Sequence, residues 1–295
     1  MENKKALIYG FSAYFLWGVF PLYFKMITEI PPIDILCHRI IWSFVFLALI
    51  LAVKAEFLEI KKLFQQPRKI VLLSCTSFLI ALNWGTYIWA VNNDHMLDAS
   101  LGYFINPLVS VCLGMFFLKE RLVGKQWLSI LLAVIGVVVQ IVEVGSLSWV
   151  ATILALSFAF YGLLRKKANV SAETGLFLET IVLLPIAFIY LFFISTDPAV
   201  DLTQNSWKLN TILLSAGIIT TVPLLLFNAA ATKISLSILG FMQYIAPSMV
   251  FLMAIFLYHE SLKLPTLVTF AFIWVALVIY TLEAIKGMKS KEKNK

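Results

Sequence analysis

Ten long apolar runs constrain this chain more than any other feature of its sequence. A run of about 20 apolar residues is the length that an α-helix needs to cross a hydrocarbon core of roughly 30 Å. With 61% hydrophobic and 13% charged residues and a mean hydropathy of +0.92, the chain has no room for a soluble domain. The sequence therefore predicts an all-α integral membrane protein with ten transmembrane helices, near residues 6–27, 33–53, 70–91, 98–118, 126–142, 148–164, 174–194, 209–231, 236–258 and 264–285.

The basic residues gather in alternate connections between these runs. If the N-terminus is inside, the inner segments hold 19 of the 23 Lys and Arg residues, including five in 54–69 and three in 165–167. This bias follows the positive-inside rule and predicts a multi-pass protein of the cell (inner) membrane with both termini in the cytoplasm. The first run lacks a small-x-small cleavage site, so we expect a retained span rather than a signal peptide. Because the inner loops account for the charge, the net +7 does not indicate nucleic-acid binding.

The two halves of the chain resemble each other. Pro107 matches Pro247 and Glu120 matches Glu260, both at an offset of 140, and "LGYFINP" matches "LGFMQYIAP" with two extra residues in the second copy. We therefore expect two five-helix repeats, residues 1–144 and 145–295. Because five is odd, the second repeat must be inverted in the membrane, and transporters built from inverted repeats hold their substrate near the midplane between the two copies.

The matched prolines predict helix breaks in the fourth and ninth runs. Proline removes a helical hydrogen bond, and in lipid this is tolerated where protein or a water-filled cavity satisfies the freed groups. Both prolines are near mid-depth and are flanked by polar side chains, namely Tyr103, Asn106, Gln243 and Tyr244. This pattern favours a central cavity, and the alternative is a structural kink at each proline without a ligand.

At this point the sequence resembles a known family. The run "LNWGTYIWAVNNDHMLDASLGYFINPL" (82–108), together with "SLSILGFMQYIAP" (235–247), is similar to the RarD branch of the EamA-domain drug/metabolite transporters, and the likeness covers nearly the whole chain. The resemblance implies ten spans in two inverted repeats. It also implies a central cavity lined largely by spans 1, 3, 4, 6, 8 and 9. It does not supply a substrate.

Few polar side chains lie deep inside the predicted spans, and such residues usually face the bundle interior. Together with aromatic neighbours they would suit a small organic molecule that is mostly uncharged or zwitterionic. The alternatives are interhelical hydrogen bonds for the asparagines and plain packing for the aromatic residues. The predicted substrate-binding residues are Trp17, Asn83, Tyr87, Tyr103, Asn106, Pro107, Tyr161, Asn228, Gln243, Tyr244 and Pro247.

Three titratable residues lie about a turn and a half inside span ends. They are His38 and Arg39 in the second run and Glu179 in the seventh. Arg39 and Glu179 are repeat partners, but their depths place them on the order of 13 Å apart along the membrane normal. We interpret them as separate gate or coupling charges, with outward snorkelling as the alternative for Arg39. Since mid-membrane carboxylates are absent, we expect weak or no proton coupling, with Glu179 the first residue to suspect if coupling exists.

The leading hypothesis is a secondary transporter, an exporter or facilitator of a small organic metabolite or drug that works by alternating access. The rival is a membrane enzyme that acts on a lipid-linked substrate through Asp94 and His95 in an outer loop, and a third possibility is a non-transporting scaffold or sensor. We expect no catalytic residues, metal or cofactor. Expected partners are the small-molecule substrate and membrane lipids, with a homodimer contact through the fifth and tenth spans left open.

Overall fold

The computed structural model describes residues 2–27, 29–93, 95–122, 124–145, 148–257 and 264–293, and these residues are helical throughout, apart from short connections. Ten segments are long and apolar enough to cross a membrane, with α10 and α11 together forming one of them, so the prediction of a ten-span all-α membrane protein is confirmed. The helices are α1 (Glu2–Phe24), α2 (Pro32–Lys54), α3 (Phe57–Phe64), α4 (Pro67–Asn92), α5 (Met96–Leu118), α6 (Gln126–Val144), α7 (Trp149–Ala168), α8 (Ala172–Ile189), α9 (Trp207–Ala231), α10 (Leu236–Met242), α11 (Ile245–Phe256) and α12 (Leu264–Lys293), with a π-helical turn, η1 (Tyr190–Ile194), after α8 and a 3₁₀ turn, η2 (Pro198–Val200), before α9.

Local sequence signals explain where the helices begin. Ser148, Ser171, Ser206 and Ser235 precede α7, α8, α9 and α10, and each hydroxyl accepts a hydrogen bond from the backbone N–H three residues later. Serine is a favoured N-cap because it satisfies one of the free N–H groups of the first turn. In the first half, α2 and α4 instead begin with proline, whose missing N–H costs nothing at the first helical position.

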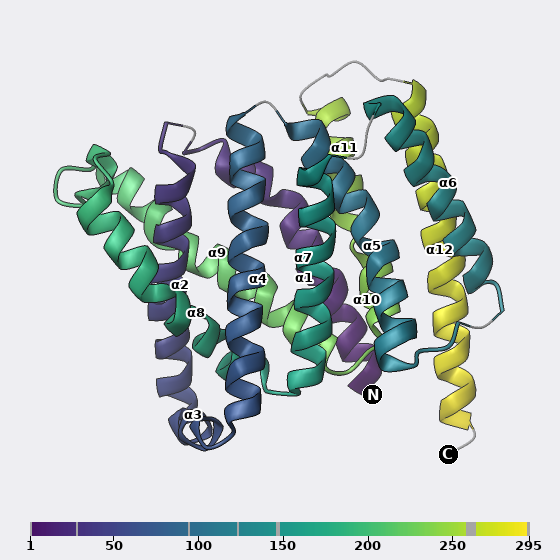
Figure 1. The fold of residues 1–295 in the computed structure, drawn as a ribbon, viewed down its shortest axis with the longest axis horizontal. Helices are drawn as coiled ribbons and strands as arrows, with labels where there is room; N and C mark the ends of the chain where they lie inside the picture. Colours follow the sequence, from purple (N-terminus) through teal and green to yellow (C-terminus); the bar gives the residue numbers. More distant parts are fainter. Residues whose placement is uncertain are drawn as a thin grey trace.

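The helices form one bundle in which the start of α1 and the end of α12 are near the same end (Figure 1). We call this the terminal end, and it also carries the short amphipathic helix α3. Helices α6 and α12 pack along each other at one edge of the bundle, away from α2 and α8 (Figure 1). The fifth and tenth spans are therefore peripheral in the bundle.

The most extensive contacts in the rest of the bundle join the first half of the chain to the second. Helix α7 packs between α4 and α5, and correspondingly α1 packs against α9 and against α10 and α11. Helix α2 packs on α9, and correspondingly α8 packs on α4. Each of these contacts becomes its counterpart when the two halves are exchanged. The two halves are thus interdigitated rather than packed as separate lobes.

The two prolines behave differently, and the prediction of a break at Pro107 is wrong. Helix α5 continues through Pro107. The second copy does break, at a turn formed by Gln243 and Tyr244, and Pro247 then lies in the first turn of α11, where its missing N–H is tolerated. The turn has two residues. The second copy of the motif, "LGFMQYIAP", is also two residues longer than the first, "LGYFINP", so the extra length explains why only the second copy breaks.

A carboxylate ties the end of the first half to the second. Glu120 follows α5, and its two oxygens accept hydrogen bonds from the backbone N–H of Leu236 (2.6 Å), the N–H of Ser237 (3.0 Å) and the Ser237 hydroxyl (2.7 Å). An acidic group at a helix N-terminus is stabilised by the free N–H groups and by the helix dipole. Its repeat partner Glu260 is outside the described residues.

Candidate functional site

Arg39 is at the centre of the first of two buried charged clusters. It lies about two turns into α2, from the end opposite the termini, and only 7% of its surface is exposed. Its Nε donates to the Thr220 hydroxyl of α9 (2.8 Å), and the guanidinium lies over the Trp84 ring of α4 at 4.3 Å from the ring centre. These contacts hold the guanidinium inward, so Arg39 does not snorkel to the surface.

Three tyrosines are near enough to interact electrostatically with this guanidinium: Tyr23 of α1, Tyr87 of α4 and Tyr103 of α5. The Tyr23 hydroxyl donates to the Ile212 carbonyl (2.9 Å), whereas the rings of Tyr87 and Tyr103 pack on each other at 5.9 Å. Tyr87 and Tyr103 lie deep in the bundle and yet keep accessible surface. This combination is typical of side chains that line internal space.

Glu179 is at the centre of the second cluster. It lies about two turns into α8, from the terminal end, and is 1% exposed. Its two oxygens accept hydrogen bonds from the Thr76 hydroxyl of α4 (2.6 Å) and the Tyr161 hydroxyl of α7 (3.2 Å). Asn228 of α9 donates from its amide to the same tyrosine oxygen (3.0 Å). Helices α4, α7, α8 and α9 are thus linked by one polar network.

Arg165 supplies the positive charge of this second cluster. Its Nη1 is 3.5 Å from a Glu179 oxygen, and its side chain is 1% exposed. The guanidinium lies against the backbone of Gly175, where an added Cβ atom would collide with it and require it to move. The sequence interpretation placed Arg165 in an inner connection, and this is wrong because α7 continues to Ala168 and buries it. A run of three basic residues gave no sign that its first member faces inward.

Threonines complete both clusters, and sequence reasoning missed them. Glu179 follows Arg39 by 140 residues, and Thr220 follows Thr76 by 144, the same spacing that separates Trp17 from Tyr161. The contact from Arg39 to Thr220 and the contact from Thr76 to Glu179 therefore join the same pair of positions with the two halves exchanged. The alignment of the two halves contained this signal, but threonine inside a helix drew no attention.

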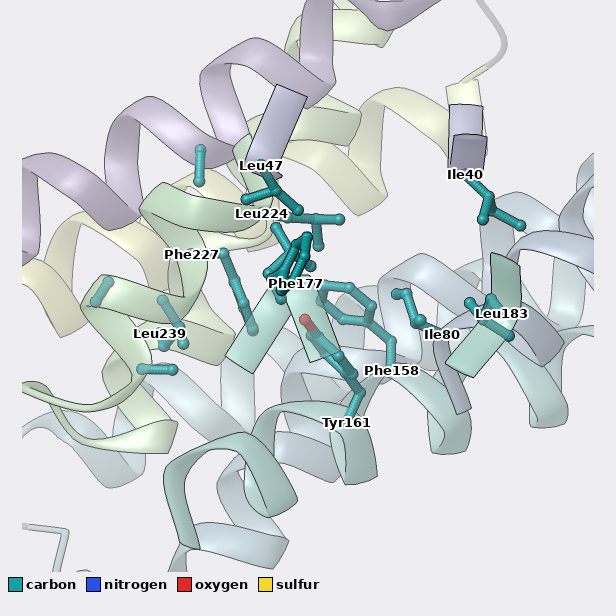
Figure 2. Close-up of a cluster of buried hydrophobic side chains, with 14 of the residues drawn as sticks. Ile40, Leu47, Ile80, Phe158, Tyr161, Phe177, Leu183, Leu224, Phe227 and Leu239 are labelled. Carbon is teal, nitrogen blue, oxygen red and sulfur yellow. The ribbon is translucent and has the colours of Figure 1, made fainter. Parts of the chain in front are cut away.

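An aromatic cluster joins α1, α7 and α9 next to the Glu179 network, which it meets at Tyr161. Trp17 of α1 packs edge-on against Tyr14 at 5.3 Å and against Phe158 at 5.7 Å, and Tyr161 stacks on Phe158 and on Phe227 at 5.9 Å each. Figure 2 shows Phe158, Tyr161 and Phe227 gathered in this core. Tyr161, predicted to line a cavity, is fully buried here, and Trp17 keeps partial exposure.

A small cavity of about 20 Å³ separates α2, α4, α8 and α9. It is bounded by Glu179 and Thr220, one from each cluster, and by the hydroxyl-bearing residues Ser43, Thr180 and Thr221. The Thr221 hydroxyl is fully buried and has no hydrogen-bond partner in the described chain. This volume is about the size of one water molecule, and apolar side chains, among them Ile40, Ile80 and Leu224, form the rest of its lining.

The amide side chains predicted to bind substrate make interhelical hydrogen bonds. Asn83 donates to the Leu154 carbonyl and the Ser157 hydroxyl, both at 3.0 Å. Asn106 is fully buried and donates to the Ala155 carbonyl at 2.5 Å. These bonds tie α4 and α5 to α7, which is the alternative role that the sequence left open for buried asparagines.

The residues around the two prolines are packed together. Gly240 of α10 lies against the Pro107 carbonyl and the Ser110 side chain of α5. Tyr244 is fully buried and donates to the Phe104 carbonyl at 3.0 Å. Gln243 is 4% exposed. These side chains join α5 to the break between α10 and α11.

Two histidines have separate surroundings. His38 is 3% exposed, accepts a hydrogen bond from the Trp42 indole at Nδ1 (3.3 Å) and leaves Nε2 without a partner among described residues. His95 lies 2.7 Å from an Asp98 oxygen at the start of α5 and stacks on Trp89 at 5.2 Å. Asp94, its predicted companion in the enzyme hypothesis, lies outside the described residues.

Comparison with known proteins decides the family. The sequence matches the EamA-like transporter family twice, over residues 4–142 and over residues 147–282. The chain belongs to the EamA-like transporter family. It is therefore a membrane transporter with several spans in the inner membrane, and the family's small-molecule substrates agree with the expected kind of partner.

Curated relatives of this family member cover almost its full length. It is 50% identical to Protein RarD of Salmonella typhimurium, over 98% of this chain and 99% of that protein. It is 42% identical to the uncharacterized transporter YojE of Bacillus subtilis, over 99% and 98%. It is 26% identical to the chloramphenicol-sensitive protein RarD of Pseudomonas aeruginosa, over 94% and 93%. These relatives confirm the resemblance to the RarD branch.

A solved crystal structure shares the fold. It superposes with a TM-score of 0.72, at 18% identity, over 95% of this chain and 98% of that one. At this identity the similarity concerns the fold alone.

Proposed function

We propose that this transporter is a secondary carrier, an exporter or facilitator, that moves a small organic metabolite or drug by alternating access between two inverted repeats, residues 1–144 and 145–295. One observation carries the proposal. Arg39 contacts Thr220, and their repeat counterparts, Glu179 and Thr76, also contact each other. Each contact therefore becomes the other when the two halves of the chain are interchanged. A site repeated on the two sides of a pseudo-two-fold axis is what a rocking mechanism uses to open first to one side and then to the other.

In this proposal both termini are in the cytoplasm, as the distribution of basic residues indicates. Arg39 then lies toward the outer side and Glu179 toward the cytoplasm. Reporters that require the cytoplasm should be active when fused after residues 60 and 168 and inactive after residues 95 and 200. Activity on the same side at all four positions would contradict the inverted arrangement.

Alternating access is tested by the labelling of single cysteines. The native Cys37, Cys75 and Cys112 are first replaced by alanine. Tyr103→Cys should then be labelled from the outer side and Asn228→Cys from the cytoplasmic side, and a transported solute should shift the two labelling rates in opposite directions. Labelling of both positions from one side, or parallel changes in both rates, would contradict alternating access.

Flux into proteoliposomes tests transport itself. Chloramphenicol is a first solute to try, because one relative carries its name. We expect saturable movement down the solute gradient, with little dependence on a pH gradient. Gradient-dependent accumulation that Glu179→Gln abolishes would show instead that this carboxyl carries a coupling proton.

A further inference from the structure

The Arg39 cluster contains a buried positive charge without a negative partner. Nε is satisfied by Thr220, and the structure provides no hydrogen-bond acceptor for the two terminal nitrogens within the chain that it describes. Arg39 as a whole is 93% buried. The hydrogen-bonding edge of the guanidinium thus keeps donors that no group of the described chain uses.

The other buried charges do not neutralise Arg39. Glu179 is next to Arg165. Asp34 is 1% exposed, but it accepts from the Ser195 hydroxyl (2.9 Å) and makes no ion pair with Arg39. A charge inside a membrane bundle is costly and usually marks a functional site whose counter-charge must be identified. No carboxylate in the described chain is an ion-pair partner of Arg39.

The groups around this edge are also free to bind. No hydrogen bond joins the Tyr87 or Tyr103 hydroxyl to another described residue, and both side chains keep some accessible surface. They come from α4 and α5, whereas Arg39 comes from α2 and its anchor Thr220 from α9. Three helices, α2, α4 and α5, thus contribute the unused donors, α9 holds the guanidinium in place, and the rings of Phe24 and Trp84 lie beside it.

Resting on the proposed transport function, we propose that Arg39 binds the carboxylate of the transported molecule, and that the substrate is a small organic acid with an apolar body. The planar guanidinium offers a carboxylate two parallel N–H donors. Trp84 and Thr220 fix its plane, and the tyrosine hydroxyls donate to the remaining carboxylate lone pairs. The adjoining cavity holds only one water, so the apolar body enters as the helices separate.

Binding to the purified full chain in detergent tests this proposal at pH 7, with 3-phenylpropionate and its uncharged match 3-phenylpropanamide as probes. We expect the carboxylate to bind about ten- to a hundredfold tighter, the range for a charge-assisted hydrogen bond. Arg39→Gln should reduce this preference to about twofold, because it weakens binding of the carboxylate far more than binding of the amide. Arg39→Lys should restore part of it, and Tyr103→Phe should weaken the carboxylate alone. Inorganic phosphate should not compete.

Three results would overturn the proposal: equal binding of the two probes to the native chain, a preference that survives in folded Arg39→Gln, or no carboxylate binding at all. Thermal unfolding establishes that each variant is folded. If Arg39→Gln does not fold, Arg39→Lys and Thr220→Val provide the comparison. We expect Thr220→Val to reduce the preference for the carboxylate to an intermediate value. Flux measured in parallel separates the two claims. Arg39-dependent carboxylate binding without flux would contradict transport and leave the site intact, whereas flux without carboxylate preference would contradict only the site.

Discussion

The two charged clusters occupy equivalent places in the two halves of the bundle and yet differ in every other respect. Glu179 accepts two hydrogen bonds and has Arg165 at 3.5 Å. Arg39 keeps one hydrogen bond and an aromatic face, and its remaining donors have no acceptor in the described chain. In the Glu179 cluster the two charges face each other and the carboxylate is hydrogen-bonded, although the three guanidinium nitrogens of Arg165 are buried without a hydrogen-bond partner among the described residues. In the Arg39 cluster the charge has no counter-charge in the described chain. We call the first the closed site and the second the open site. The comparison teaches that repetition of a backbone does not require repetition of a function.

The difference extends to the helix interfaces beside each charge. At the Arg39 side, Gly217 of α9 lies directly on the Trp42 backbone of α2, and the Ser43 hydroxyl donates to the Gly217 carbonyl at 3.3 Å. At the Glu179 side, the α4–α8 interface is filled by larger side chains, Leu73 and Leu178. The α2–α9 contact beside Arg39 is therefore closer than the α4–α8 contact beside Glu179. This close contact holds the backbone of the open site in place, while the side chains of the site stay available to a ligand.

The largest expected effect comes from removing the negative charge of the closed cluster. Glu179→Leu leaves the Arg165 guanidinium buried without a counter-charge, and we expect the free energy of unfolding to fall by about 3–5 kcal/mol. Thermal unfolding of the purified protein measures the loss. Adding Arg165→Met should recover most of it, because an apolar pair can replace a buried ion pair at little cost.

Arg39→Met is the matched change at the open site. It removes a charge that has no protein counter-charge, so we expect a change within about 1 kcal/mol. A loss as large as that of Glu179→Leu would show that Arg39 is neutralised by protein after all.

The second prediction concerns the close contact beside Arg39. In Gly217→Ala, the new Cβ would meet the Trp42 backbone at 2.4 and 2.5 Å, and backbone atoms have little freedom to move away. We expect a loss of about 1–3 kcal/mol, the usual cost of overpacking. Gly85→Ala is the control, since nothing lies within 4 Å of its added Cβ. Equal effects on unfolding temperature would contradict the close contact.

The third prediction applies one chemical change to both clusters. Tyr161→Phe removes the hydroxyl that joins Glu179 to Asn228, and leaving these buried groups unsatisfied should cost about 1–3 kcal/mol. Tyr103→Phe removes a hydroxyl without a partner in the described chain, so its effect should stay within about 0.5 kcal/mol. Chemical unfolding of the two variants under the same conditions makes the comparison. The reverse order would invert our assignment of open and closed sites.

The smallest expected effect concerns the hydrogen bonds that hold α7. Asn106→Leu removes the bond to the Ala155 carbonyl and should cost about 0.5–1.5 kcal/mol. Asn93→Leu is the control, because its amide also donates to a helix carbonyl, that of Trp89, but at the exposed end of α4. A change in flux without a change in stability would return Asn106 to the substrate-binding residues.

The sequence by itself determined the class, the number of spans and the family. Apolar length and the positions of basic residues follow from the energy of moving groups into lipid, which acts on each segment separately. The internal repeat was also visible, because an offset of 140 residues can be read along the chain. Even the break in the ninth span followed the sequence, where two additional residues precede Pro247.

Only the tertiary structure decided which polar residues share an environment. Arg165 looked like one more basic residue of an inner loop, and whether it faces lipid, water or Glu179 depends on how far α7 extends and where α8 crosses it. Asn106 and Tyr244 looked free to bind a ligand and turned out to be bonded to carbonyls of neighbouring helices. A side chain's partner is set by the packing of helices that are distant in the sequence. Apolar patterning determines which segments cross the membrane, but it does not determine which side chains meet.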